Sequence, residues 1–214
     1  MKNADSYTRN LIAVIGIAAF ACIIIEAVIR KVGAWLPESL FFIAFIFLCL
    51  WQWNNMKLTH TSFSLLIIAL FLHCAGVFGF YSESPLPFAW DHVTHFFGIF
   101  AVNIFLFHFF EDRLQKGKTF NNLFVLFIVL LASLGVGSLI ENIEFSGYTF
   151  LGEGEGVLYF GVGDGTLSSN MEAIDTDMMN FAGGGWFNAM WDLVFNLLGA
   201  ITGVIVMLLY KKIV

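Results

Sequence analysis

Long apolar runs separated by short polar segments are the main feature of the chain. Crossing a bilayer as a helix takes about 20 mainly apolar residues. Six runs are candidates: Leu11–Val28, Ser39–Trp53, Ser62–Phe80, Trp90–Phe110, Leu123–Glu144 and Ala189–Tyr210. Ser39–Trp53 is the shortest of them. The pattern predicts an all-α, polytopic membrane helix bundle of about six transmembrane helices, with residues 1–214 forming a single transmembrane domain.

The first apolar run also has features of a signal peptide, because Ala19-Phe20-Ala21 precedes Cys22. The apolar residues continue through Ile23–Ile25, which makes the run longer than the hydrophobic region of a signal peptide. We therefore expect this segment to remain as the first transmembrane helix.

Composition supports a membrane protein and excludes some partners. The chain is 59% apolar and 12% charged, whereas soluble domains carry roughly 25% charged residues. The net charge of −6 argues against a nucleic-acid partner, which would require clustered Lys and Arg. Cys22, Cys49 and Cys74 lie inside apolar runs without a CxxC motif, so we expect them to pack in the core rather than to form a disulfide or zinc site.

The distribution of basic residues predicts the orientation in the membrane. With six spans the two termini share one side, which carries eight of the ten basic residues. The other side carries only Arg30 and Lys31. Because cytoplasmic loops are enriched in Lys and Arg, we expect cytoplasmic N- and C-termini in the bacterial inner membrane.

The segment 145–188 is predicted to be a long, acidic, Gly-rich loop outside the membrane, without Lys or Arg. Val157–Phe160 is apolar enough for a short strand or an interfacial contact. Asp164-Gly165 suggests a calcium loop, but the required acidic spacing is missing. The loop is either simply solvated or a lid over a site, as long loops in compact proteins often are.

A repeated motif marks the candidate site. The pattern W-D-x-V-x-(H/N)-x-x-G occurs at Trp90–Gly98 and again at Trp191–Gly199. Helical spacing places polar and small residues on three stripes: Asp91, His95 and Gly98; Ser133, Gly137, Glu141 and Glu144; and Asp192, Asn196, Gly199 and Gly203. Small residues allow close helix approach. The predicted topology places the acids of all three stripes at the outer membrane surface.

Four carboxylates on facing helices cannot all be charged without compensation. The options are a bound cation, shared protons, or hydrogen bonds to Trp90, Trp191 and Asn196. Because helical bundles build metal sites from inward-facing carboxylates and His, we predict a divalent metal ion. Its ligands would be Asp91, His95, Glu141, Glu144 and Asp192. This ligand set suits manganese, iron, magnesium or zinc and does not distinguish among them.

A purely structural interpretation is also available. Asp91 and Asp192 begin their apolar runs, where acids are favoured by the helix dipole. We expect Glu141 and Glu144 in the last turn of their helix, where the dipole disfavours acids. That mismatch favours a functional role for the two glutamates.

At these positions the chain resembles the VanZ-like bacterial membrane proteins. Their pattern is Asp-x-x-x-His at one helix start, a Glu-containing helix end, and Asp-x-x-x-Asn-x-x-Gly in a final helix. Asp91/His95, Glu141/Glu144 and Asp192/Asn196/Gly199 match this pattern, within a motif region of residues 90–203. Asn188 stands where relatives often have a second Asp. The resemblance implies a cytoplasmic-membrane location in bacteria and, for the family's namesake, a link to glycopeptide resistance at the cell surface.

Three functions remain open. The first is a protein with an outward-facing cation site that acts on or binds a lipid or envelope precursor; as an enzyme it would be a metal-dependent hydrolase of lipid-type substrates, with Glu141 or Glu144 as catalytic base. The second is a non-enzymatic accessory protein that binds an amphiphile, with the acids as a structural network. The third is a proton or cation transporter, which requires more polar residues at depth than the chain offers.

Overall fold

The computed structural model describes residues 2–33, 35–81, 83–115, 117, 120–151 and 184–211. These residues form helices without any strand, as predicted from the apolar runs. The α-helices are α1 (Lys2–Arg30), α2 (Trp35–Trp51), α3 (His60–Cys74), α4 (Trp90–Phe110), α5 (Phe120–Leu151) and α7 (Gly184–Lys211). Two 3-10 helices, η1 (Ala75–Phe78) and η2 (Glu111–Arg113), extend α3 and α4.

Five helices of the described chain are long and apolar enough to cross a membrane. Their candidate spans are Ser6–Arg30, His60–Phe78, Trp90–Arg113, Phe120–Ser146 and Ala189–Lys211. The sixth apolar helix, α2, has 17 residues. The prediction of a polytopic helix bundle is therefore confirmed. Ser39–Trp53 was the shortest predicted span, and α2 is the shortest of the apolar helices once α3 is counted together with η1, which extends it.

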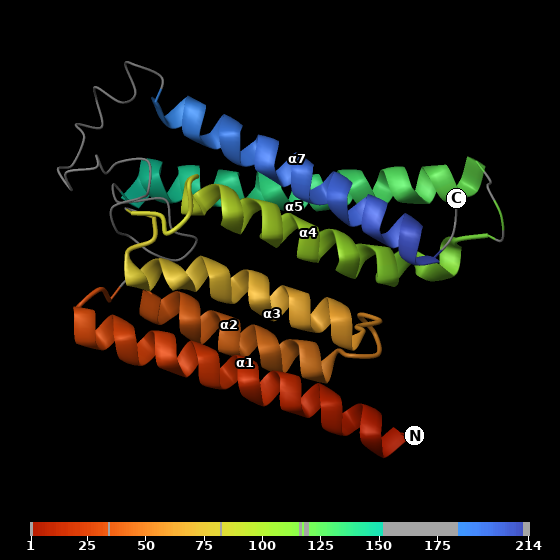
Figure 1. Ribbon diagram of the computed structural model, residues 1–214, viewed down its shortest axis with the longest axis horizontal. Helices are drawn as coiled ribbons and strands as arrows, with labels where there is room; N and C mark the ends of the chain where they lie inside the picture. The colour runs from red at the N-terminus through yellow and green to blue at the C-terminus, as the bar shows by residue number, and fades with distance from the viewer. Residues whose placement is uncertain are drawn as a thin grey trace.

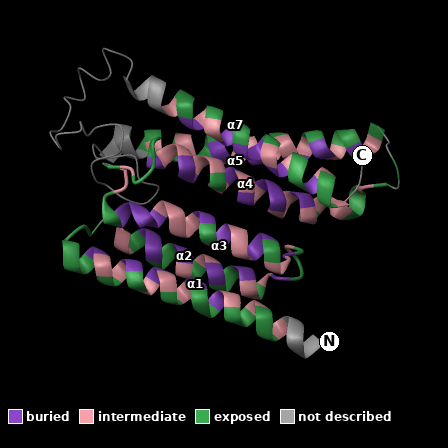
Figure 2. Ribbon diagram, viewed as in Figure 1, coloured by how far each residue is buried: buried purple, intermediate pink, exposed green. Residues whose placement is uncertain are grey.

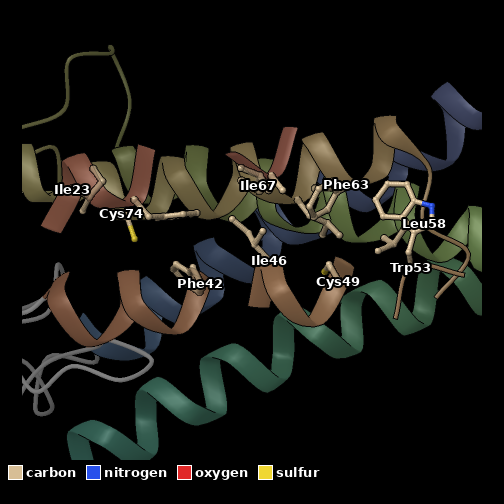
Figure 3. Close-up of a cluster of buried hydrophobic side chains, with 14 of the residues drawn as sticks. Ile23, Phe42, Ile46, Cys49, Trp53, Leu58, Phe63, Ile67 and Cys74 are labelled. Atoms are coloured by element: carbon tan, nitrogen blue, oxygen red, sulfur yellow. The ribbon is translucent and has the colours of Figure 1, made fainter. Parts of the chain in front are cut away.

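The helices form two groups of three (Figure 1). Helices α1, α2 and α3 pack together, α4 packs against both α5 and α7, and α3 contacts α4 to join the groups. The first group encloses a large apolar core that includes Phe42, Ile46 and Phe63 (Figure 3). Exposed residues occur along the outer helices (Figure 2). Many of them are large and apolar, as a lipid-facing surface requires.

Ion pairs identify one end of the bundle. Lys57, in the turn after α2, pairs with Asp112, and Lys211 at the end of α7 pairs with Glu111. The N-terminal end of α1 lies at this same end (Figure 1). We call it the terminal end, and the opposite end, where α4 begins at Trp90, the site end.

Local signals explain the turns that lead to the site end. Helix α3 begins with a capping box, in which Thr59 and Ser62 satisfy each other's backbone N–H groups. Gly79 closes η1 with a left-handed φ of 88°, a conformation that glycine adopts without steric cost. The chain then reverses through residues 80–89 and starts α4, which runs back toward the terminal end.

Two sequence predictions need correction. Helix α5 continues to Leu151 and α7 starts at Gly184, so both edges of the predicted 145–188 loop are helical. No proline interrupts residues 145–151, so every residue of this segment keeps the backbone N–H that a helix needs. The possible strand at Val157–Phe160, the Asp164-Gly165 turn and the lid lie outside the described residues.

Cys22 is exposed on the bundle exterior, whereas Cys49 and Cys74 are buried as predicted.

A carboxylate–histidine cluster as candidate functional site

His95 lies at the centre of the acids that the sequence singled out. Its Nε2 is 3.3 Å from Asp91 Oδ1 and 3.8 Å from Asp192 Oδ1. Its Nδ1 is 3.4 Å from Glu141 Oε1 and 3.2 Å from Asn196 Oδ1. Helices α4, α5 and α7 therefore bring four polar side chains together around the imidazole of His95.

The cluster is withdrawn from the surface. The side chains of Asp91 and Glu141 are each 13% exposed, that of His95 is 9% exposed, and that of Asp192 is 2% exposed. Asn196 is fully buried. Carboxylates at this depth are costly unless a cation, a proton or hydrogen bonds compensate them.

Glycines in α7 and α5 allow the helices to come close enough for these contacts. A Cβ on Gly199 would lie 2.3 Å from the backbone oxygen of Phe96 in α4. A Cβ on Gly203 would lie 2.6 Å from Asn103 Oδ1, and one on Gly137 would lie 2.7 Å from Asn196 Nδ2. The predicted close approach at Gly199 and Gly203 is confirmed. It is wrong for Gly98, because a Cβ there would meet nothing within 4 Å.

Two overlapping sets of side chains have the geometry to hold a metal ion. In each set the ligand atoms lie within 4.8 Å of one another. The first set is Asp91, His95 and Asp192, and the second is His95, Glu141 and Glu144. His95 belongs to both, with Nε2 facing two acids of the first set and Nδ1 facing Glu141 of the second. All five predicted ligands thus lie in one cluster.

The expected position of the two glutamates within their helix is wrong. Because α5 extends to Leu151, Glu144 lies about two helical turns before its end and Glu141 about three. The dipole acts mainly within the first and last turns. It therefore supplies no argument for or against the function of these acids. Their proximity to His95 is what supports a role for both glutamates in the site.

The tryptophans of the two motifs differ in burial, and the Nε1–H of Trp90 is donated to a backbone carbonyl rather than to an acid. Trp90 is buried and its Nε1 donates a 3.0 Å hydrogen bond to the Leu72 carbonyl. Trp191 is 54% exposed. His92 stacks on Phe195 with ring centroids 4.2 Å apart. These aromatic residues brace α4 against α3 and α7 around the cluster.

One polar pair lies deeper between the helices. Asn103 Nδ2 donates to Ser133 Oγ at 3.1 Å, and both residues are fully buried. This hydrogen bond joins α4 to α5 on the terminal-end side of the cluster and keeps the two helices in register.

The sequence reasoning missed a second polar group at the site end. Glu38 in α2 is buried and its Oε2 lies 3.0 Å from His73 Nε2. His73 Nδ1 lies 2.9 Å from the Tyr81 hydroxyl. Both ring nitrogens of His73 therefore have polar partners, which the pattern of apolar runs did not predict. An acid within the apolar helix Trp35–Trp51 is the signal that could have found them.

A comparison with known protein families shows to which family the chain belongs. No curated protein and no solved structure matches this chain. A family model described as "Predicted membrane protein (DUF2238)" matches residues 9–213. The match includes most of α1 and all of α2 and α3, which the VanZ-like resemblance did not cover. It also includes every residue of the carboxylate–histidine cluster. The chain therefore belongs to the DUF2238 family of membrane proteins.

Proposed function

We propose that the carboxylate–histidine cluster binds one divalent cation and that the protein uses this site to act on, or to bind, a lipid or envelope precursor. The observation that carries the proposal is the close grouping of Asp91, His95 and Asp192, whose ligand atoms lie within 4.8 Å of one another. Asp192 is 2% exposed, so a charged carboxylate there needs a compensating positive charge.

The two nitrogens of His95 favour the set with Asp91 and Asp192 as the primary ligands. Metal-binding histidines commonly donate the N–H of their other ring nitrogen to a carboxylate or carbonyl oxygen, which fixes the tautomer. Here Nε2 faces Asp91 and Asp192, while Nδ1 is 3.2 Å from Asn196 Oδ1 and 3.4 Å from Glu141. An Nδ1–H donated to Asn196 or Glu141 leaves the Nε2 lone pair for the cation.

The remaining acids suit a supporting or catalytic role. A divalent cation here would act as a Lewis acid toward an ester or phosphate group. Glu141 faces His95 from α5, and Glu144 lies close enough to share the second candidate set. Either glutamate is placed to accept a proton from a substrate or water. This is the chemistry of a metal-dependent hydrolase of lipid-type substrates.

The location of the site agrees with such a substrate. Arg9, Lys57, Arg113 and Lys211 belong to the terminal end, and by the positive-inside rule we place that end in the cytoplasm of a bacterium. The site end then faces outward, where envelope precursors and lipid headgroups are found. The VanZ-like motif at Asp91/His95 and Asp192/Asn196 supports the same placement.

The acids around His95 also fit a second function. Acids approach both nitrogens of His95, so a protonated imidazolium could compensate them without any metal. The cluster would then be a structural network in a non-enzymatic, amphiphile-binding accessory protein. Transport ranks lower, because Asn103 and Ser133 form a polar pair at depth, whereas the acids of the described spans lie toward the two ends of the bundle.

Metal analysis distinguishes these functions. The protein is purified in detergent without chelator for elemental analysis, then stripped and titrated with Mn²⁺, Zn²⁺ or Mg²⁺. We expect about one equivalent of metal per chain and, at 100 times the Kd, a stabilisation of about 2.7 kcal/mol. Asp192→Asn and His95→Gln should each weaken cation binding by ~10-fold or more. Glu111→Gln, at the opposite end of the bundle, is the matched control and should bind normally.

Absence of stoichiometric metal from wild type, together with no cation-dependent shift in unfolding, would contradict the proposal. His95 would then be the positive charge of a structural network. Retention of wild-type metal affinity by both Asp192→Asn and His95→Gln would place the cation elsewhere.

A further inference from the structure

A buried chain of three titratable side chains lies beside the carboxylate–histidine cluster and plays no part in it. Glu38 of α2 is 1% exposed. Its Oε2 is 3.0 Å from His73 Nε2, and His73 Nδ1 is 2.9 Å from Tyr81 Oη. An acid that orients a histidine, which in turn contacts a hydroxyl, is the arrangement that activates nucleophiles and bases in enzymes.

The ring of Tyr81 is held in a fixed position. The Trp35 ring stacks on it with centroids 5.9 Å apart and an interplanar angle of 16°. On Gly76 a Cβ would lie 2.4 Å from the Tyr81 ring and 2.5 Å from Trp35. Only a glycine therefore fits beneath these two aromatic rings. A tyrosine held this closely at the start of the connection between η1 and α4 indicates that the position of its hydroxyl matters.

The hydroxyl of Tyr81 has a choice of acceptors. Thr94 Oγ1 lies 3.5 Å from Tyr81 Oη and itself donates to the Asp91 carbonyl at 2.7 Å. Tyr81 has one proton, so it donates either to Thr94 or to His73. When it donates to His73 Nδ1, the other ring nitrogen carries the N–H and donates to the Glu38 carboxylate.

We propose that Tyr81, His73 and Glu38 form a second reactive site, in which the Tyr81 hydroxyl is the catalytic group and acts on a hydroxyl-bearing molecule at the site end of the membrane. His73 and Glu38 are positioning residues. A hydroxyl group of the substrate gives its proton to Tyr81 Oη while the Tyr81 proton passes to His73 Nδ1. The imidazolium so formed is stabilised by the Glu38 carboxylate. Both protons return along the same path to the substrate oxygen, so the step is a reversible proton transfer that activates this oxygen.

The surroundings of Tyr81 suit an amphiphile. Three apolar side chains near Tyr81 in the sequence are 39–50% exposed: Phe78 at the end of η1, and Leu86 and Phe88 shortly before α4. Exposed apolar side chains beside a polar group are typical of contact with the boundary between headgroups and acyl chains. The hydroxyl group belongs either to a lipid headgroup or to water at that boundary.

The reactivity of Tyr81 toward N-acetylimidazole tests the proposal without any substrate and without metal. The phenol oxygen attacks the acetyl carbon, the carbon–nitrogen bond breaks, and the phenol proton leaves with the imidazole. Acetylation of Tyr81 and of Tyr7 is followed by mass spectrometry in the full-length protein. Tyr7 is 70% exposed and serves as the internal reference.

Glu38→Gln is the decisive variant, because its amide oxygen can still accept the His73 N–H but carries no charge. We expect acetylation of Tyr81 in Glu38→Gln and His73→Gln to be ~10-fold slower than in wild type, with the Tyr7 rate unchanged. Thr94→Val, which removes the competing acceptor and leaves the triad intact, should be at least as reactive as wild type. Unfolding temperatures establish that each variant folds.

Equal Tyr81 rates in folded wild type and folded Glu38→Gln would overturn the proposal, since the contacts would then serve packing alone. Loss of reactivity in Thr94→Val would overturn it as well, because the reactive hydrogen bond would be the one to α4.

Nanodiscs identify the source of the substrate hydroxyl group. They are made of phosphatidylglycerol or of phosphatidylmethanol, two anionic lipids of which only the first has headgroup hydroxyls. Protection of Tyr81 by phosphatidylglycerol alone indicates a headgroup hydroxyl, and equal rates indicate water. Because the assay uses metal-free protein, its failure leaves the cation site unaffected.

Discussion

The substitution Gly199→Ala tests how the cluster is held together. The new Cβ would lie 2.3 Å from the Phe96 oxygen and 3.1 Å from the Phe100 nitrogen. A carbon–oxygen contact needs about 3.3 Å, so α7 must move away from α4 by about 1 Å. The obstacle is backbone, which cannot rotate aside. Overpacking of this kind costs up to about 3 kcal/mol.

The helix propensity of alanine offsets part of that cost, by about 1 kcal/mol. We therefore expect Gly199→Ala to lose about 2 kcal/mol of unfolding free energy. The same movement would stretch the His95–Asn196 contact, now 3.2 Å, beyond hydrogen-bonding distance. Cation binding should weaken together with stability.

Gly98→Ala is the matched control on the facing helix. A Cβ there meets nothing within 4 Å, so the substitution should stabilise the protein by about 0.5–1 kcal/mol. Unfolding in mixed detergent micelles, followed by circular dichroism, measures both variants. A Gly199→Ala variant as stable as wild type, or two variants with the same sign of effect, would refute the close approach of α4 and α7.

Three further outcomes are expected. Ser133→Ala removes the partner of Asn103 Nδ2 and should cost about 0.6–1.7 kcal/mol, measured in the same unfolding assay; an unchanged stability would mean that the pair contributes nothing. Trp90→Phe keeps the buried ring but removes the donor to the Leu72 carbonyl, so we expect a loss of about 1–2 kcal/mol, and near-UV circular dichroism would report whether packing survives. A reporter fused after Lys212 should read cytoplasmic and one inserted between residues 152 and 165 should read external; reversed signals would place the cluster at the cytoplasmic face.

Apolar run length and helical spacing were sufficient to predict the helices and the members of the cluster. Each run long enough for a span became a helix, because a backbone surrounded by lipid must satisfy its own hydrogen bonds. Asp91 and His95, one helical turn apart, were predicted to share a face, and their side chains lie 3.3 Å apart. Local signals also predicted the glycines of α7 that contact α4.

Other features depended on contacts between distant segments. The position of Glu141 and Glu144 within α5 was mistaken, because polar residues near a predicted membrane surface do not by themselves end a helix. Gly98 has the same spacing as Gly199 in the repeated motif, yet only Gly199 faces backbone. Which of two equivalent glycines lies at an interface is decided by the rotation of each helix about its axis.

The sequence by itself determined the class of protein, the helices and the residues that carry charge into the bundle, since these follow from local hydrophobicity and the geometry of a single helix. The tertiary structure decided which nitrogen of His95 faces which acid, and it joined Glu38, His73 and Tyr81 from three separate segments. Such contacts depend on the packing of side chains between helices, where a change of 1 Å or of one rotamer selects a different partner.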